Sequence, residues 1–227
     1  MTNKVPLIIN TEKTVSEIQK EILPKCDEFH VQVGYFWFSG FEEIYKSLKD
    51  KKIKIIIGIN YDQQIYNLTS SSAIKQRYFN FLSNDINTTE ILDQKIRLDS
   101  HNLFVEKIKN GSLEIRCDPE KNDHSKFFVF KYLKKFNKNG FNPGVVLAGS
   151  SNFSRSGFLT ELQKNNNYLF HDKESYEAHT NRFNESWSKS IPIVSKENFE
   201  EFDNKVIKKT WINKTPKPYL LFLKVLD

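Results

Sequence analysis

The 227-residue sequence has few cysteines, glycines and prolines, with 2, 8 and 7 of them respectively. These are the residues that are abundant in disulfide-rich and in disordered chains. Cys26 and Cys117 lie far apart and form no CxxC pair, so we expect neither a disulfide framework nor a thiolate zinc site. The scarcity of glycine and proline argues against a low-complexity or disordered chain. The sequence is instead 38% apolar, with 19 phenylalanines and 9 tyrosines, which is ample for the core of one large domain.

Long hydrophobic runs are also missing. No stretch approaches the roughly 18 apolar residues that a membrane span requires, and the five-residue apolar run near the N-terminus is too short for a signal peptide. We therefore expect a soluble, cytoplasmic protein with no membrane partner. The formal net charge of +6 permits a polyanionic partner such as nucleic acid. Many solvated lysines on an ordinary soluble protein would give the same charge, so charge alone does not decide.

Hydrophobic periodicity predicts an α/β fold. The first half shows a helix over 14–23, a strand over 29–38, a helix over 40–49 and a buried strand over 53–59. This order suggests a parallel strand pair joined by a crossover. The rest predicts helices within 62–110, strands over 113–117, 125–130, 145–148 and 168–170, and a helix over 176–187. The fold class that follows is a mixed β-sheet flanked by helices on both faces.

The domain organisation has one open point. We assign residues 1–190 to the domain and residues 191–227 to a C-terminal helical extension or linker. Residues 216–226 are strongly apolar and the chain stops one residue later. This ending suggests a fragment of a longer polypeptide, although a terminal helix docked on its own domain accounts for it equally well.

Two short motifs carry the chemistry. His124 and Lys126 precede the apolar run of residues 127–130, and residues two apart on a strand share a face, about 7 Å apart. A second apolar run ends in the sequence GSSN, where Ser150 and Asn152 share one face of the strand and Ser151 points to the other. Alone, HxK fits a surface strand end and GSSN fits a turn. Together, with fewer than 30 residues between His124 and Asn152, they are far more specific.

The pair of motifs resembles the phospholipase D superfamily, particularly its single-motif bacterial nuclease branch. The sequence FSRSGF after GSSN adds to that resemblance, and residues 211–226 look like the junction that follows such a domain at the front of bacterial helicases. The resemblance implies a phospholipase-D-like fold and a metal-independent phosphodiesterase acting on DNA without a cofactor. It also implies an accessory role beside a helicase domain in the same polypeptide.

The resemblance further implies a mechanism. His124 would attack phosphorus to give a covalent phosphohistidine that water hydrolyses, since neutral imidazole is nucleophilic near pH 7. Lys126 would supply charge, and Ser150 and Asn152 hydrogen bonds, to the non-bridging oxygens. A second histidine would protonate the leaving oxygen. His171 also has a lysine two residues on, Lys173, but no GSxN sequence follows it. Since the sequence has one pair of HxK and GSxN motifs, the resemblance implies a homodimer in which each chain donates His124.

Two positions depart from the family pattern. Lys131 stands where the longer motif has an aspartate, which the nuclease branch often lacks. The acid expected eleven residues after Asn152 is Gln163 here, while Glu161 lies two positions earlier, so either Glu161 substitutes or activity is weakened. The alternative is a catalytically degenerate DNA-binding module of a helicase. A phospholipase and a purely structural appendage of a helicase are less favoured readings.

Overall fold

The described part of the computed structural model comprises residues 7–9, 14–58, 70–88, 94–118, 123–137, 143–159 and 165–210. These residues form one mixed 8-stranded sheet in the order β1-β7-β6-β5-β2-β3-β4-β8. The strands are β1 (Leu7–Ile9), β2 (Cys26–Val33), β3 (Lys52–Ile57), β4 (Leu113–Cys117), β5 (Phe127–Tyr132), β6 (Gly144–Gly149), β7 (Asn166–Phe170) and β8 (Ile191–Val194). β2, β3 and β4 are parallel, and every other pairing is antiparallel.

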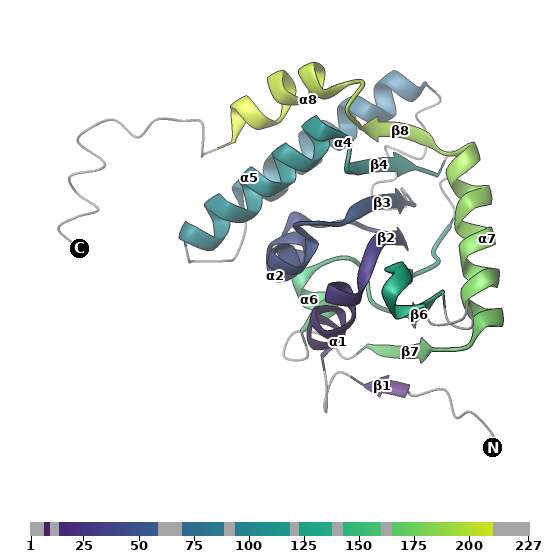
Figure 1. Cartoon of the computed structure of the whole chain (residues 1–227). Coiled ribbons are helices and arrows are strands. Elements are labelled where there is room, and N and C mark those ends of the chain that lie inside the picture. The colour runs from purple at the N-terminus through teal and green to yellow at the C-terminus, as the bar shows by residue number, and fades with distance from the viewer. Residues whose placement is uncertain are drawn as a thin grey trace.

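Helices cover both faces of the sheet, as the sequence predicts. The α-helices are α1 (Val15–Ile22), α2 (Phe38–Leu48), α4 (Ser71–Asn87), α5 (Gln94–Asn110), α6 (Arg155–Phe158), α7 (Lys173–Lys189) and α8 (Phe199–Lys205), with 3₁₀ turns at Leu23–Lys25, Lys134–Phe136 and Ile207–Lys209. Among the described helices, α7 alone packs on one face, while α1, α2 and α5 lie on the opposite side (Figure 1). The sheet is therefore the middle of three layers.

Side chains alternate between two cores along β3, β5 and β6. Phe128 and Phe130 of β5 enter the larger core, where both pack against Phe29 of β2, whereas Phe127 and Val129 pack beneath α7 against Phe183. Because both faces of the central strands are covered, apolar residues occupy consecutive positions rather than every second one. This double burial explains the continuous apolar run after Lys126.

Most predicted elements are present with shifted ends. Thr14 caps α1 in a capping box, in which Thr14 and Glu17 each accept a hydrogen bond from the other's backbone N–H. β2 and β3 pair in parallel, with α2 as the crossover between them. Gly111 follows α5 with a φ of 80°, the left-handed backbone conformation typical of a helix end. The strand predicted over 29–38 ends at Val33, and the one predicted from residue 125 begins at Phe127. The sequence analysis missed β1, β8 and α8.

The described structure continues the domain past residue 190. β8 pairs with β4 at the sheet edge, and Phe202 and Val206 of the following segment are buried in the larger core. Residues 191–210 are thus part of the same packed unit rather than an extension from it. The apolar segment 216–226 lies outside the described residues. No described helix is long and apolar enough to cross a membrane.

A buried carboxyl supports the start of α2. Trp37, the residue before this helix, makes no capping hydrogen bond with its side chain. Asp85 of α4 accepts a hydrogen bond from the backbone N–H of Phe38 instead, at 2.5 Å, which satisfies a helix donor that has no intrahelical partner. Burial raises the pKa of Asp85 to about 7, against the lowering effect of the Phe38 hydrogen bond and with a further raising effect from Glu42.

Asp85 makes the stability of the fold depend on pH. The unfolded carboxyl releases its proton near pH 3.9, whereas the folded carboxyl keeps it up to about pH 7, so wild-type stability falls as pH rises through this window. The asparagine of Asp85→Asn stays neutral at every pH, and its side-chain oxygen can still accept the hydrogen bond from the backbone N–H of Phe38. We predict that the free energy of unfolding of Asp85→Asn, relative to wild type, rises between pH 4.5 and 7.5 in urea titrations. An equal difference at every pH would contradict this account.

Candidate active site

The sheet topology brings the two sequence motifs to one edge. β5 runs antiparallel to β2, so its first residue, Phe127, lies opposite Gln32 near the end of β2. β6 runs antiparallel to β5, and Ala148 near its end pairs with Phe127 in turn. The segments 123–126 and 149–152 therefore meet where the parallel strands β2 and β3 end, which is where α/β sheets commonly place their sites.

Lys126 and Asn152 converge on Gly34, the residue after β2. A Cβ atom on Gly34 would lie 3.5 Å from Asn152 Oδ1 and 3.7 Å from Lys126 Nζ. Partial burial lowers the pKa of Lys126, and the nearby Asp123 carboxylate opposes that shift. An ammonium group and an amide thus flank the space that the glycine leaves unfilled. The sequence predicts both polar groups at one site but gives no sign that Gly34 forms its floor.

The amide of Asn152 is oriented by the backbone. The N–H of Tyr35 donates to Asn152 Oδ1 at 3.2 Å. Because this bond occupies the oxygen, the Nδ2 group is the part of the amide that remains to donate to a ligand. The loop after β2 therefore fixes the orientation of the Asn152 amide, with its oxygen toward Gly34.

His124 lies in a segment that is not a strand, contrary to the sequence prediction. Its side chain is exposed, and its carbonyl accepts a hydrogen bond from Lys126 Nζ at 2.9 Å. The backbone N–H of Ser125 donates to Asp123 Oδ1 at 2.7 Å. This local bond uses an amide that would otherwise be available for sheet pairing, and the strand starts only at Phe127.

The two serines of GSSN have structural partners. Ser150 Oγ donates to Asn165 Oδ1 at 3.1 Å and accepts from the backbone N–H of Asn166 at 3.0 Å, which fastens the loop to β7. Ser151 is fully buried, and its Oγ accepts from Asn167 Nδ2 at 2.9 Å. The predicted role of Ser150 in phosphate binding would require its hydroxyl group to give up the hydrogen bond to Asn165 and donate to the phosphate instead.

The remaining predicted positions lie apart from this group. Glu161 and Gln163 fall in residues 160–164, outside the described structure. Lys131 donates to Glu28 Oε1 at 2.7 Å across β5 and β2, and Glu28 also contacts His30 Nε2 at 3.1 Å. Lys131, which stands where the longer phospholipase D motif has an aspartate, thus belongs to a network of charged and polar side chains farther along β5. Within the described ranges, no three His, Cys, Asp or Glu side chains form a group that could hold a metal ion.

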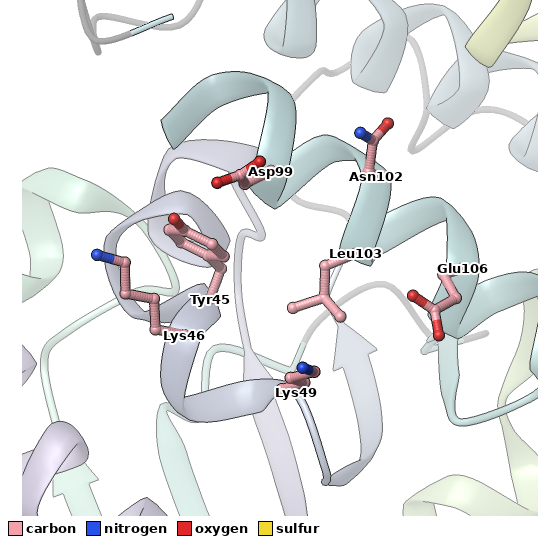
Figure 2. Close-up of a pocket in the computed structure, with 7 residues that line it drawn as sticks. All are labelled: Tyr45, Lys46, Lys49, Asp99, Asn102, Leu103 and Glu106. Carbon is pink, nitrogen blue, oxygen red and sulfur yellow. The ribbon is translucent and has the colours of Figure 1, made fainter. Parts of the chain in front are cut away.

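A separate hollow of about 470 Å³ lies between α2 and α5 (Figure 2). Charged side chains of both signs line it, including Lys49, Asp99 and Glu106. It contains none of the motif residues and no nucleophile paired with a base. The sheet edge around Gly34, rather than this hollow, is therefore where the predicted site residues of the two motifs come together.

No protein-family model and no curated protein matches the sequence. Among solved structures, the chain is similar to Nuc from Salmonella typhimurium, a phospholipase D family member, with 12% identity, a TM-score of 0.48 and coverage of 85% of this chain and 99% of that one. The chain is also similar to NucT from Helicobacter pylori, with 10% identity, a TM-score of 0.45 and coverage of 83% of this chain and 98% of that one. A third similar structure is TrmBL2, an archaeal chromatin protein, with 14% identity, a TM-score of 0.41 and coverage of 84% of this chain and 56% of that one.

Proposed function

We propose that this chain is a metal-independent phosphodiesterase that cleaves DNA through a phosphohistidine on His124. The observation that carries this proposal is the convergence of Lys126 Nζ and the Asn152 side chain over Gly34, next to the segment that exposes His124. A nucleophile, a cation and a directional donor together meet the main demands of phosphoryl transfer. Residues 124–126 and 149–152 also carry the resemblance to the phospholipase D superfamily.

In the proposed reaction, a ring nitrogen of His124 forms a bond to phosphorus as the bond to the leaving oxygen breaks. The leaving oxygen takes a proton from a second histidine, and water later displaces His124 and returns that proton. Negative charge grows on the non-bridging oxygens during both steps. Lys126 and the Nδ2 group of Asn152 would stabilise this charge, more strongly at a partly desolvated site than in bulk water.

A second chain is proposed as the source of the acid. His30 and His101 are buried, and burial lowers the pKa of each to about 4, so both are neutral near pH 7. Nδ1 of His179 lies 2.8 Å from the carbonyl oxygen of Ser175, and its ring packs on Phe127. None of these three is placed as a proton donor, and His171 follows the end of β7 that lies away from the GSSN loop. This arrangement favours a homodimer with the His124 of each chain in one site.

The proposed setting is a helicase polypeptide in the cytoplasm, in which this unit acts on DNA beside a downstream helicase domain. A net charge of +6 would favour approach to a polyanion. The resemblance of residues 211–226 to a helicase junction supports this setting.

The catalytic proposal predicts cleavage of plasmid or single-stranded DNA in EDTA that is lost in His124→Ala. The control variant is His171→Ala, since His171 is exposed and follows the end of β7 that lies away from the GSSN loop. Gel assays should show full cleavage by this control. A requirement for added Mg²⁺, or full activity in His124→Ala, would contradict the proposal.

The assembly proposal predicts a two-fold dimer in solution. Light scattering at tens of micromolar should give twice the 26.7 kDa chain mass, because one described chain supplies one accessible motif histidine. Mixing His124→Ala chains with wild-type chains should lower the activity of the wild-type chains as mixed dimers form. Full activity from a strictly monomeric protein would refute this prediction.

The phosphate-binding proposal predicts that Gly34→Ala impairs cleavage without unfolding the protein. The added methyl would make ordinary contacts with Asn152 and Lys126, and Gly34 has no left-handed backbone conformation that a side chain would strain. It would occupy space expected for a phosphate oxygen, so kcat/KM should fall on the order of 10²-fold, as for a misplaced substrate. Thermal melting and steady-state kinetics measure the two effects separately.

Ser151→Ala is the opposite control for Gly34→Ala. It should leave the buried amide of Asn167 without its 2.9 Å partner and reduce stability by about 1–3 kcal/mol, while the folded fraction cleaves normally. Wild-type kinetics in Gly34→Ala, or a loss of stability as large as that of Ser151→Ala, would count against the phosphate site.

A further inference from the structure

The segment that presents His124 is held by side chains rather than by strand pairing. Asp123 is the centre of these contacts. Its Oδ1 accepts from the backbone N–H of Ser125 at 2.7 Å, and its Oδ2 accepts from Gln32 Nε2 and lies 3.7 Å from the Arg182 guanidinium. Gln32 belongs to β2 and Arg182 to α7, so one carboxylate joins the segment to the sheet and to the helix above it.

The residue on the other side of His124 is held as well. Arg182 donates to Ser125 Oγ at 2.6 Å, so this guanidinium contacts both neighbours of the histidine. The backbone N–H of Asp123 donates to Asp118 Oδ2 at 3.3 Å. The Asp123 carbonyl packs directly on Gly58, where a Cβ atom would lie only 2.1 Å from its oxygen. The backbone is thereby fixed before and after His124, while the ring remains exposed.

The charge state of Asp123 suits this arrangement. Burial raises the pKa of its carboxyl, but hydrogen bonds from Ser125, the charge of Arg182 and the hydrogen bond from Gln32 outweigh burial and hold the pKa below its ordinary value. The carboxylate is thus ionised near neutral pH. Arg182 is 58% exposed, so its ion pair contributes little to global stability.

We propose that Asp123 is a positioning residue for His124, and that Gln32 and Arg182 hold its carboxylate so that the imidazole faces the phosphorus beside Lys126 and Asn152. This inference rests on the proposed phosphodiesterase function and adds the device that aims the nucleophile. A displacement of about 1 Å at a reacting group can cost on the order of 10²-fold in rate. Residues 123–125, which precede the first residue of β5, therefore need such a clamp.

The kinetic test compares Asp123→Ala with Asp123→Asn. The alanine variant should lose on the order of 10²-fold in kcat, with KM within about threefold of wild type, because Lys126 and Asn152 still bind the phosphate. Asparagine keeps an oxygen for the Ser125 amide and should recover part of kcat. Gly58→Ala should lower kcat similarly, since its methyl would displace the Asp123 carbonyl.

The matched control is Glu185→Ala. Glu185 is an exposed carboxylate on α7, paired with Lys189 at 2.7 Å, and its loss should leave kcat unchanged. Wild-type kcat in Asp123→Ala would overturn the proposal. Equal losses in Asp123→Ala and Asp123→Asn accompanied by equal drops in melting temperature would also overturn it, since they would indicate a purely structural role.

Hydrogen exchange tests the clamp independently of cleavage. The Ser125 amide should be protected in wild type and in Asp123→Asn, and should exchange faster in Asp123→Ala, whether or not DNA is cut. An unprotected Ser125 amide in wild type would refute the clamp. Inactivity of wild-type protein with a protected amide would instead refute the phosphodiesterase function.

Discussion

The antiparallel register of β5 is the constraint on which the site depends. β5 joins the parallel strands β2, β3 and β4 to the antiparallel strands β6, β7 and β1. Its pairing sets Phe127 opposite Gln32 on one side and Ala148 on the other. A slip of one residue would move Phe128 out of the larger core and Phe127 into it. Burial of both faces thus fixes the register, and the register brings the HSK and GSSN segments together.

The site combines groups held by the sheet with groups held by local hydrogen bonds. Asn152 is oriented by the Tyr35 amide, and Gly34 leaves the space between Asn152 and Lys126 open. Residues 123–125 precede the first residue of β5 and are held by contacts of the Asp123 carboxylate. The ends of β2, β5 and β6 therefore place the proposed phosphate-binding groups, while side-chain contacts from β2 and α7 place the proposed nucleophile.

The elements with strong apolar periodicity could be predicted from the sequence, and those set by distant partners could not. The crossover between β2 and β3 follows from local patterns, as does the paired occurrence of His124 and Asn152. β8 has only four residues and forms because β4 offers an open edge, so no local pattern indicated it. The start of β5 was misplaced because a bond from the Ser125 amide to its own neighbour competes with the ladder.

Several contributors to the site have no recognisable motif. Gly34 matters because two side chains from distant segments approach it, and Arg182 matters because α7 crosses the face of the sheet that carries Gln32. Asp123 adjoins His124 in the sequence, but its importance depends on contacts with β2 and α7. Only the three-dimensional arrangement brings these residues together, and the proposed roles rest on that arrangement.

The central claim is that Lys126 and Asn152 form a phosphate site over Gly34, and a crystal structure of the protein with inorganic phosphate tests it most directly. The account predicts the anion within hydrogen-bonding distance of Lys126 Nζ and Asn152 Nδ2, with the His124 ring facing its phosphorus. Phosphate bound elsewhere, with the space above Gly34 closed by side chains, would contradict it.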